Sequence, residues 1–128
     1  TYVGAPMLYY GTEMGMWSAD DPENRMPTWW RRMDEDIFKT YQSAFLLRHT
    51  HPALRRGGFK VLETRDESQV FAFERRLGDE RLVILLNRGH SEATLNINHL
   101  KGLKVIYSTD LIASTRRLPP LSAAVFGK

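Results

Sequence analysis

The stretch APMLYYGTEMGMWSADDPENRMPTWW, residues 5–30, carries the most structural information in this chain. It begins with a short apolar run, Met7 to Tyr10, that shows no polar alternation. Such a run predicts a strand that is buried on both faces. Gly11 ends the run, and Gly15 and Pro22 mark a loop after it. We therefore expect a buried strand followed by a long, shaped loop.

The composition of that loop indicates the kind of ligand it suits. Residues 5–30 contain three tryptophans, two tyrosines, an Asp-Asp-Pro turn and an arginine. Aromatic faces can stack on the apolar faces of pyranose rings, while carboxylates and guanidinium groups form hydrogen bonds with sugar hydroxyls. The loop is therefore a candidate sugar-binding segment.

A helix is predicted from about Asp34 to Arg48. Asp34 is a suitable N-cap, and the first turn carries Glu35 and Asp36, where the helix dipole favours negative charge. One apolar face is formed at helical spacing by Ile37, Phe38, Tyr41, Ala44 and Phe45. Pro52 is expected to stop the helix just downstream.

The remainder, from Phe59 onward, has the pattern of an all-β domain. Two strands are predicted, Val70 to Phe73 and Leu82 to Leu86, with hairpin chemistry in the segment 77–80 between them. Alternating apolar residues predict further strands around residues 95–97 and 105–107, and residues 121–126 should close the sheet. Short strands with frequent turn signals favour an antiparallel sandwich.

The alternation also predicts which side chains form the core of this domain. The residues expected inside are Phe71, Phe73, Val83, Leu85, Val105 and Val125. Among the aromatic residues, those expected to point inward are Phe59, Phe71, Phe73, Tyr107 and Phe126.

The order of elements is therefore strand, loop, helix and then all-β. A single strand–loop–helix unit cannot bury both faces of its strand, and a complete (β/α)8 barrel needs roughly 250 residues. With 128 residues, the chain is expected to be a fragment. The predicted fold is mainly β: residues 1–56 form the last strand, loop and helix of a barrel, and residues 57–128 form a C-terminal antiparallel β-sandwich.

Composition excludes several classes of function. The net charge is +3, and the arginines occur as scattered pairs rather than on one face, so nucleic acid is not an expected partner. No apolar run approaches the roughly 20 residues that span a bilayer, so no membrane partner is expected. The absence of cysteine excludes disulfides and thiolate metal sites. The compartment, cytoplasmic or secreted/periplasmic, stays open.

Three ordered motifs resemble one known family. YYGTEMGMW (residues 9–17), followed by DDPENR (20–25) and a Pro-x-Trp (27–29), resembles the C-terminal stretch of the α-amylase superfamily, glycoside hydrolase family 13. The neopullulanase, cyclomaltodextrinase and maltogenic-amylase group is the most similar part of it. YQSAFLLRHTHPALRRG (41–57) resembles the last barrel helix of those enzymes, and FAFERRLGDERLVILLNRG (71–89) the opening hairpin of their C-terminal sandwich.

The resemblance implies an α-glucan or maltooligosaccharide partner and four substrate-binding residues. Asp21 and Arg25 match the Asp-Pro-x-x-Arg pair that in this family bonds a glucose ring on the non-reducing side of the cleavage point. Trp17 and Tyr10 are further candidates, with packing on the barrel rim as the alternative for Trp17. Glu13 resembles a supporting residue. Ser18 and Pro27-Thr28 depart from the residues usual in the family.

No catalytic residue is expected in this chain. Retaining glycosidases need two carboxyl groups about 5–5.5 Å apart. In the family these groups come from earlier barrel strands, so they would lie upstream of Thr1. The remaining acids are expected on the solvated surface: Glu63, Asp66, Glu67, Glu74, Asp79, Glu80, Glu92 and Asp110. His49 and His51 lack a convincing third ligand, so neither a metal nor a cofactor is expected.

The sequence therefore favours the C-terminal part of a retaining α-glucan hydrolase acting on α-1,4 bonds, with α-1,6 bonds as an alternative. The isolated chain should be inactive. Two other interpretations stay open: a stand-alone carbohydrate-binding or structural β-sandwich module, and part of a related transglycosylase or trehalose-forming enzyme. Because the predicted strand at Met7 to Tyr10 lacks partners, we expect either disorder before about residue 30 or a homodimer.

Overall fold

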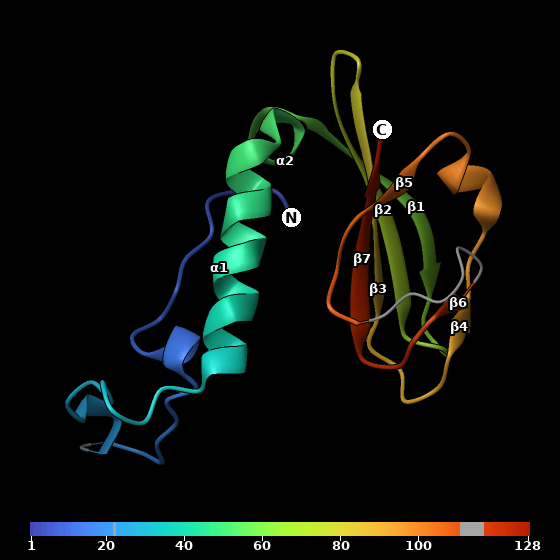
Figure 1. Cartoon of the computed structure of the whole chain (residues 1–128). Coiled ribbons are helices and arrows are strands. Elements are labelled where there is room, and N and C mark those ends of the chain that lie inside the picture. The colour runs from blue at the N-terminus through green and yellow to red at the C-terminus, as the bar shows by residue number, and fades with distance from the viewer. Residues whose placement is uncertain (22, 111–116) are drawn as a thin grey trace. The chain divides into compact units, whose positions relative to one another are not determined.

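The computed structural model describes residues 1–21, 23–110 and 117–128. It contains two compact units: residues 4–47 form one, and residues 1–3 together with 48–128 form the other. The elements of both are labelled in Figure 1. We call the first the loop–helix unit and the second the sheet unit.

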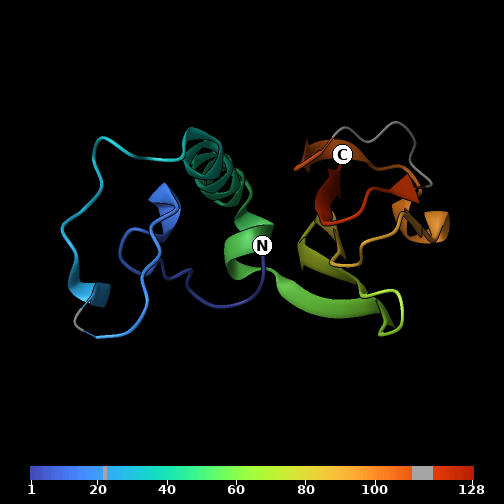
Figure 2. The same ribbon diagram turned by 90° about the horizontal axis from the view of Figure 1, so that it is seen from below.

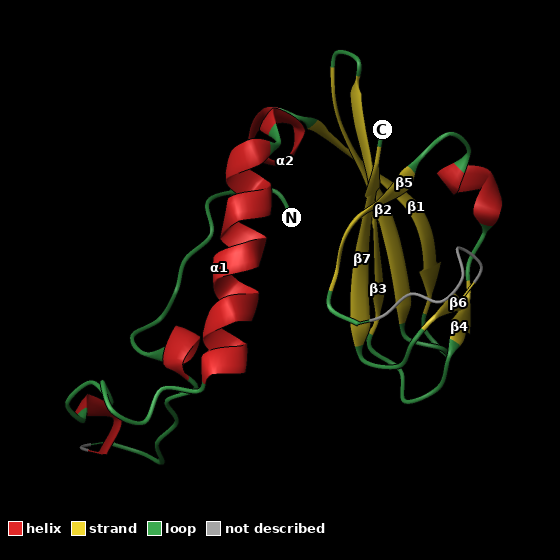
Figure 3. Ribbon diagram, viewed as in Figure 1, coloured by secondary structure: helices red, strands yellow, loops and turns green. Residues whose placement is uncertain are grey.

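In the sheet unit, five strands form one antiparallel sheet in the order β1-β2-β3-β7-β5. Their bounds are β1 Gly58–Arg65, β2 Val70–Leu77, β3 Glu80–Asn87, β5 Lys104–Ser108 and β7 Ser122–Gly127. Two short strands, β4 Ala93–Thr94 and β6 Arg117–Leu118, pair as a separate ribbon. The strands are drawn in yellow in Figure 3. The predicted mainly β, antiparallel fold is confirmed.

The predicted hairpin is confirmed with a two-residue turn. Strands β2 and β3 pair from Val70↔Asn87 to Leu77↔Glu80, leaving Gly78 and Asp79 at the tip. Gly78 has a φ of 57°, a conformation that glycine adopts without steric cost. A glycine at the first tip position is typical of a two-residue hairpin turn whose twist matches that of the flanking strands.

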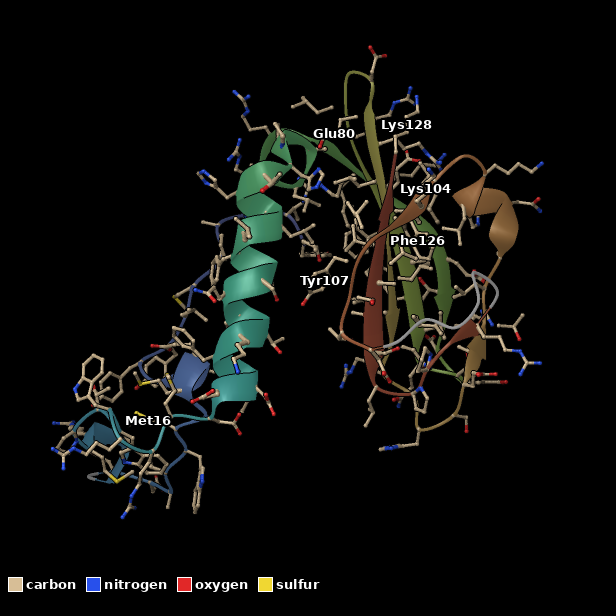
Figure 4. The ribbon with its side chains drawn as sticks, viewed as in Figure 1. Met16, Glu80, Lys104, Tyr107, Phe126 and Lys128 are labelled. Carbon is tan, nitrogen blue, oxygen red and sulfur yellow. The ribbon has the colours of Figure 1, made fainter. Side chains whose placement is uncertain are left out.

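One face of the sheet carries the main hydrophobic core. Side chains from the three central strands pack there against the 3-10 helix η3 (Ile97–Leu100) and the β4–β6 ribbon. The buried members of this cluster are Ala72, Val83, Leu85, Leu95, Leu100, Leu118, Ala124 and Phe126. Phe126 and Tyr107 are labelled in Figure 4, on β7 and β5. This second layer is short, so it differs from the full second sheet of a regular sandwich.

The opposite face of the sheet holds aromatic residues. Phe73 is 1% exposed, and its ring centroid lies 5.2 Å from that of Phe59 and 5.3 Å from that of Phe71. Within the sheet unit, the Tyr2 ring packs edge-on against Phe59 and Phe73. The helix α2, Pro52–Arg56, also lies in this unit, and its Ala53 and Leu54 are fully buried. The sequence did not predict α2 as a separate helix.

Most of the predicted core residues are inside, with two differences. Phe73, Val83, Leu85 and Val125 are buried, whereas Phe71 is half-buried. The prediction for Val105 was wrong: it is 39% exposed. It lies on β5, the edge strand, where the register with β7 shifts between Val105 and Tyr107. A bulge of this kind turns side chains away from the regular alternation.

The strand predicted around residues 95–97 was also wrong. Leu95 is buried, but the backbone turns into η3 at Ile97. The side chain of Asn96 accepts a hydrogen bond from the Asn98 amide at 3.2 Å and so caps this short helix. Asparagine competes with strand pairing through such local bonds.

In the loop–helix unit, the predicted helix is confirmed as α1, Glu35–Thr50, whose last turn continues into the sheet unit. The Asp34 carboxylate accepts hydrogen bonds from the amides of Asp36 and Ile37, both at 3.0 Å. Pro52 follows the helix end, as expected, and begins α2. The apolar face of α1 is partly covered: Ile37 and Phe45 are 37% and 36% exposed, and the other three residues of the face are half-buried.

The buried strand predicted from Met7 to Tyr10 is not formed. These residues form a loop, drawn in green in Figure 3, and Met7 is 88% exposed. A central strand needs a hydrogen-bonded neighbour on each side. The sheet of this chain runs β1-β2-β3-β7-β5 and does not include these residues. The apolar run therefore remains without strand partners among the described residues.

Candidate functional site

The candidate site lies in the loop–helix unit, where two glycines shape the backbone after Tyr10. Gly11 and Gly15 have φ values of 75° and 74° and flank the 3-10 helix η1, Thr12–Met14. The amides of Met14 and Met16 both donate to the Gly11 carbonyl at 3.0 Å. The positive φ of Gly11 favours glycine, and a Cβ added there would lie 2.3 Å from the Met16 sulfur, so the Met16 side chain would have to move.

The loop lines a hollow of about 330 Å³ that is open to solvent on one side. Its lining combines aromatic rings, thioethers and small polar groups: Tyr9, Tyr10, Thr12, Met16, Trp17, Ser18, Ala19, Asn24 and Met26. The structure thus brings together two of the predicted site residues, Tyr10 and Trp17. Met16, from the same wall, is labelled in Figure 4.

These two aromatic residues differ in their surroundings. The Trp17 side chain is 77% exposed. The Tyr10 hydroxyl donates a hydrogen bond to the Met26 carbonyl, which ties the two ends of the loop together. Trp17 therefore offers a free ring face for stacking, whereas Tyr10 also holds the loop closed.

Asp21 and Arg25 form an ion pair close in sequence to the hollow but outside its lining. Arg25 Nε lies 3.0 Å from Asp21 Oδ1, and Arg25 Nη2 lies 3.4 Å from Oδ2. Their side chains are 79% (Arg25) and 56% (Asp21) exposed, and such exposed pairs contribute little to stability. Both groups are thus accessible to a ligand. Pro22, expected to fix this turn, lies outside the described residues.

Other residues singled out in the loop are less available. Glu13 is half-buried on η1, which fits a supporting position. Trp29 is half-buried, while Trp30 is 76% exposed. None of these three lines the hollow.

Three acids of the sheet unit were wrongly expected to be simply solvated. Glu74 is paired with Arg81 at 2.6 Å, and Glu63 with Arg65 at 2.7 Å. Glu80 bonds His51 Nδ1 at 2.8 Å through one oxygen and the Ala53 amide at 2.7 Å through the other. Figure 4 labels Glu80 near α2. The partners of Glu74 and Glu80 lie on other elements, so local sequence does not predict them; the Glu63–Arg65 pair lies within β1.

The groups around the hollow are of the kind that bind a sugar ring. Within the described residues, no group of three or more His, Cys, Asp or Glu side chains could hold a metal ion. The helices described are also too short or too polar to cross a membrane. Aromatic faces, an accessible carboxylate–guanidinium pair and loop hydroxyls are the groups that bind a polyhydroxylated ring.

Comparison with known proteins shows which proteins this chain is similar to. Residues 59–113 match the family "Maltogenic Amylase, C-terminal domain". Neopullulanase 2 of Thermoactinomyces vulgaris is 35% identical over 98 residues, which cover 74% of this chain and 17% of that protein. A cyclomaltodextrinase from a Bacillus species is 35% identical over 97 residues, with the same coverage. The resemblance to the α-amylase superfamily is confirmed.

Solved structures agree with these relatives. The debranching enzyme of Nostoc punctiforme, in an acarbose-soaked crystal, matches 98% of this chain with a TM-score of 0.81 and 32% identity. The cyclic α-maltosyl-(1→6)-maltose hydrolase of Arthrobacter globiformis matches with a TM-score of 0.76 and 28% identity. The chain spans only 26% and 27% of these two proteins, as it spans 17% of the two relatives above.

Proposed function

We propose that this chain serves as the C-terminal part of a retaining α-glucan hydrolase acting on α-1,4 glucosidic bonds. The observation that carries the proposal is the hollow in the loop–helix unit, found in a chain whose relatives include a neopullulanase and cyclomaltodextrinases. Activity on α-1,6 bonds is the alternative. It is supported by the debranching enzyme and the hydrolase of a (1→6)-linked maltose derivative among the similar structures.

In this proposal the four predicted site residues each make a different contact with one glucose ring. Trp17 presents its exposed face to the apolar side of the ring, and Tyr10 lines the hollow beside it. Asp21 and Arg25 exchange part of their mutual ion pair for hydrogen bonds with sugar hydroxyls. This exchange costs little free energy, because an exposed ion pair contributes little and water or a sugar hydroxyl can replace one partner.

The acid pair that cleaves the bond is proposed to come from another part of the protein. Glu74, Glu80 and Glu63 are held by His or Arg partners or by a backbone amide. We therefore assign these carboxylates a structural role within the sheet unit. A transferase outcome is the second candidate, because cyclomaltodextrin glucanotransferases also occur among the relatives, one of them at 28% identity.

Incubation of the purified chain with starch, cyclodextrin and pullulan tests the missing acid pair. We expect no release of reducing sugar, and we expect release once the upstream coding sequence is restored. Turnover by the chain alone, lost in a Glu74→Gln or Glu80→Gln variant, would contradict the proposal. The ratio of hydrolysis to transfer products from the longer protein then separates the two candidates.

We also propose that a second copy of the chain covers the unpaired run from Met7 to Tyr10. Met7, Leu8 and Tyr9 are 88%, 39% and 68% exposed, and water does not favour a contiguous apolar run. Sedimentation of the purified chain should therefore show a dimer, and a Leu8→Lys change should shift it toward monomer. A monomer at all concentrations would refute this partner.

A further inference from the structure

The least expected residue of the sheet unit is a buried arginine. Arg75 lies in β2, is 1% exposed, and pairs with no carboxylate among the described residues. Its Nη1 donates to the Thr1 carbonyl at 2.9 Å, and its Nη2 donates to the Gly57 carbonyl at 3.0 Å. Burial, together with the nearby positive charge of Arg48, lowers the pKa of Arg75. A buried cation is costly unless fixed acceptors surround it.

The acceptors of Arg75 come from two distant segments of the chain. Gly57 directly follows α2, while Thr1 is 74 residues away in sequence. The guanidinium group is planar and rigid, so it can hold two carbonyls at a fixed angle to one another. Arg75 thus joins β2 to the end of α2 and to residues 1–3.

A second arginine strengthens the same junction. Arg48, in the last turn of α1, donates from Nη1 to the Tyr2 carbonyl at 3.2 Å and to the Leu54 carbonyl at 2.5 Å. The Tyr2 ring packs edge-on against Phe59 at 5.0 Å between centroids. Residues 1–3 are therefore held by backbone hydrogen bonds and by aromatic packing, and in both Figure 1 and Figure 2 the N-terminus lies beside α2.

This junction coincides with the points where the chain passes between the two units. The chain leaves the sheet unit after Val3 and returns to it at Arg48. The hydrogen bond between Arg48 and Tyr2 therefore links the exit point to the return point. Holding the two ends of a 44-residue excursion together removes much of its conformational freedom.

We propose that Arg75 is a positioning residue: together with Arg48 it forms a clasp within the sheet unit that fixes residues 1–3 and the last turn of α1, the points where the chain leaves this unit and returns to it. The path from Val3 to Tyr10 is only seven residues long, so a fixed start restricts where the candidate sugar loop begins. The contribution to sugar binding rests on the proposed function. The clasp itself does not, because it is a property of the chain without ligand.

The absence of cysteine allows a direct test on the whole chain with paired nitroxide labels. One pair, Val3→Cys with Lys60→Cys, reports whether residues 1–3 stay docked on the sheet. A control pair, Lys60→Cys with Lys104→Cys, spans the sheet between its two edge strands. All three positions are exposed, so labelling should not disturb the core.

In the parent chain each label pair should give a single narrow distribution of label-to-label distances. Arg75→Met should broaden the distribution of the Val3–Lys60 pair and leave that of the Lys60–Lys104 pair unchanged. Arg76→Met is the matched control, because Arg76 is exposed on the same strand and makes one long bond of 3.4 Å to Gly78 within its own hairpin. Arg75→Lys keeps the cation without the two-pronged geometry and should fall between them.

Two outcomes would overturn the clasp. One is a Val3–Lys60 pair whose distribution stays narrow in Arg75→Met. The other is broadening of both label pairs together, which would make Arg75 a general stabiliser of the sheet. Should Arg75→Met fail to fold, Tyr2→Ala removes the aromatic anchor without touching the buried cation and must give the same selective loss.

The effect on binding is measured separately in the protein restored with its upstream sequence. Arg75→Met should raise KM for maltoheptaose several-fold with little change in kcat, while Arg76→Met should change neither. If the labels report a clasp but the restored protein has no glucan activity, the proposed function fails and the clasp stands. If KM is unchanged although the distribution of the Val3–Lys60 pair broadens, the clasp does not position the loop.

Discussion

Truncation of Phe73 offers the sharpest test of how the sheet unit is held together. Phe73 is 1% exposed on β2, opposite Val61 on one side and Ile84 on the other. Its ring makes aromatic contacts with Tyr2, Phe59 and Phe71 at centroid distances of 5.9, 5.2 and 5.3 Å. Deleting a buried phenylalanine ring typically costs about 3–5 kcal/mol, because transfer energy is lost and a cavity remains.

We therefore expect Phe73→Ala to lower the free energy of unfolding by about 3–5 kcal/mol. Phe71→Ala is the matched control. It removes the same ring from the same face of β2, but Phe71 is half-buried, so about half that loss is expected. Since a small domain has only about 5–15 kcal/mol of stability, Phe73→Leu provides a milder variant that should still fold.

Urea denaturation followed by far-ultraviolet circular dichroism is the suitable assay. Circular dichroism is preferred to tryptophan fluorescence because all three tryptophans lie within residues 4–47 and none belongs to the sheet unit. A loss below about 0.5 kcal/mol for Phe73→Ala would refute the reasoning, since that is the scale of surface substitutions. Equal losses for Phe71→Ala and Phe73→Ala would show that burial does not set the cost.

Three further changes test other contacts. In the protein restored with its upstream sequence, Arg25→Ala should weaken maltooligosaccharide binding by about 1.5–3 kcal/mol, the scale of a hydrogen bond to a charged group. Calorimetry measures this affinity, and an unchanged value would remove this loop from the site. Asn87→Ala should cost about 1–3 kcal/mol in urea unfolding, because the buried Asn87 amide serves three main-chain carbonyls that would lose their donor. Glu80→Ala should cost about 0.5–2 kcal/mol by removing the acceptor at the start of α2, with faster hydrogen exchange at the Ala53 amide. Asp79→Ala, next to it in the exposed turn, should leave that amide unchanged.

Elements specified by local chemistry were predictable from the sequence. The start of α1 follows from the Asp34 carboxylate, which bonds two amides within its own first turn. The β2–β3 hairpin follows from Gly78 between two apolar strands. In both cases the decisive contact spans a few residues, so a short stretch of sequence contains all the information.

Features that depend on distant partners were not predictable in this way. Residues 7–10 have the composition of a buried strand, but burial requires neighbouring strands that this sheet does not provide. Arg75 belongs to one of the scattered arginine pairs, and nothing nearby in the sequence indicates its burial, because its acceptor on Thr1 is 74 residues away. The hydrogen bond between Glu80 and His51 similarly spans 29 residues.

The candidate site was partly predictable from the sequence, because some of its residues lie close together in the chain. Tyr10 and Trp17 are seven residues apart, and the two glycines between them bend the loop so that both line one hollow. The bond from Tyr10 to the Met26 carbonyl spans 16 residues and was missed. Asp21 and Arg25 do pair at the predicted spacing, although they lie outside the lining of the hollow.

The register shifts at the two outer strands have a consequence for how copies of this protein can meet. β1 is irregular between Val61 and Glu63, and β5 between Val105 and Tyr107, so neither outer strand presents an unbroken row of backbone donors and acceptors. Natural sheets use such interruptions, together with edge lysines such as Lys60 and Lys104, to resist edge-to-edge aggregation. Joining of two sheets into one continuous fibre-like sheet is therefore disfavoured at both ends. Any self-association of the chain should use residues 4–47 and leave the sheet unit dispersed.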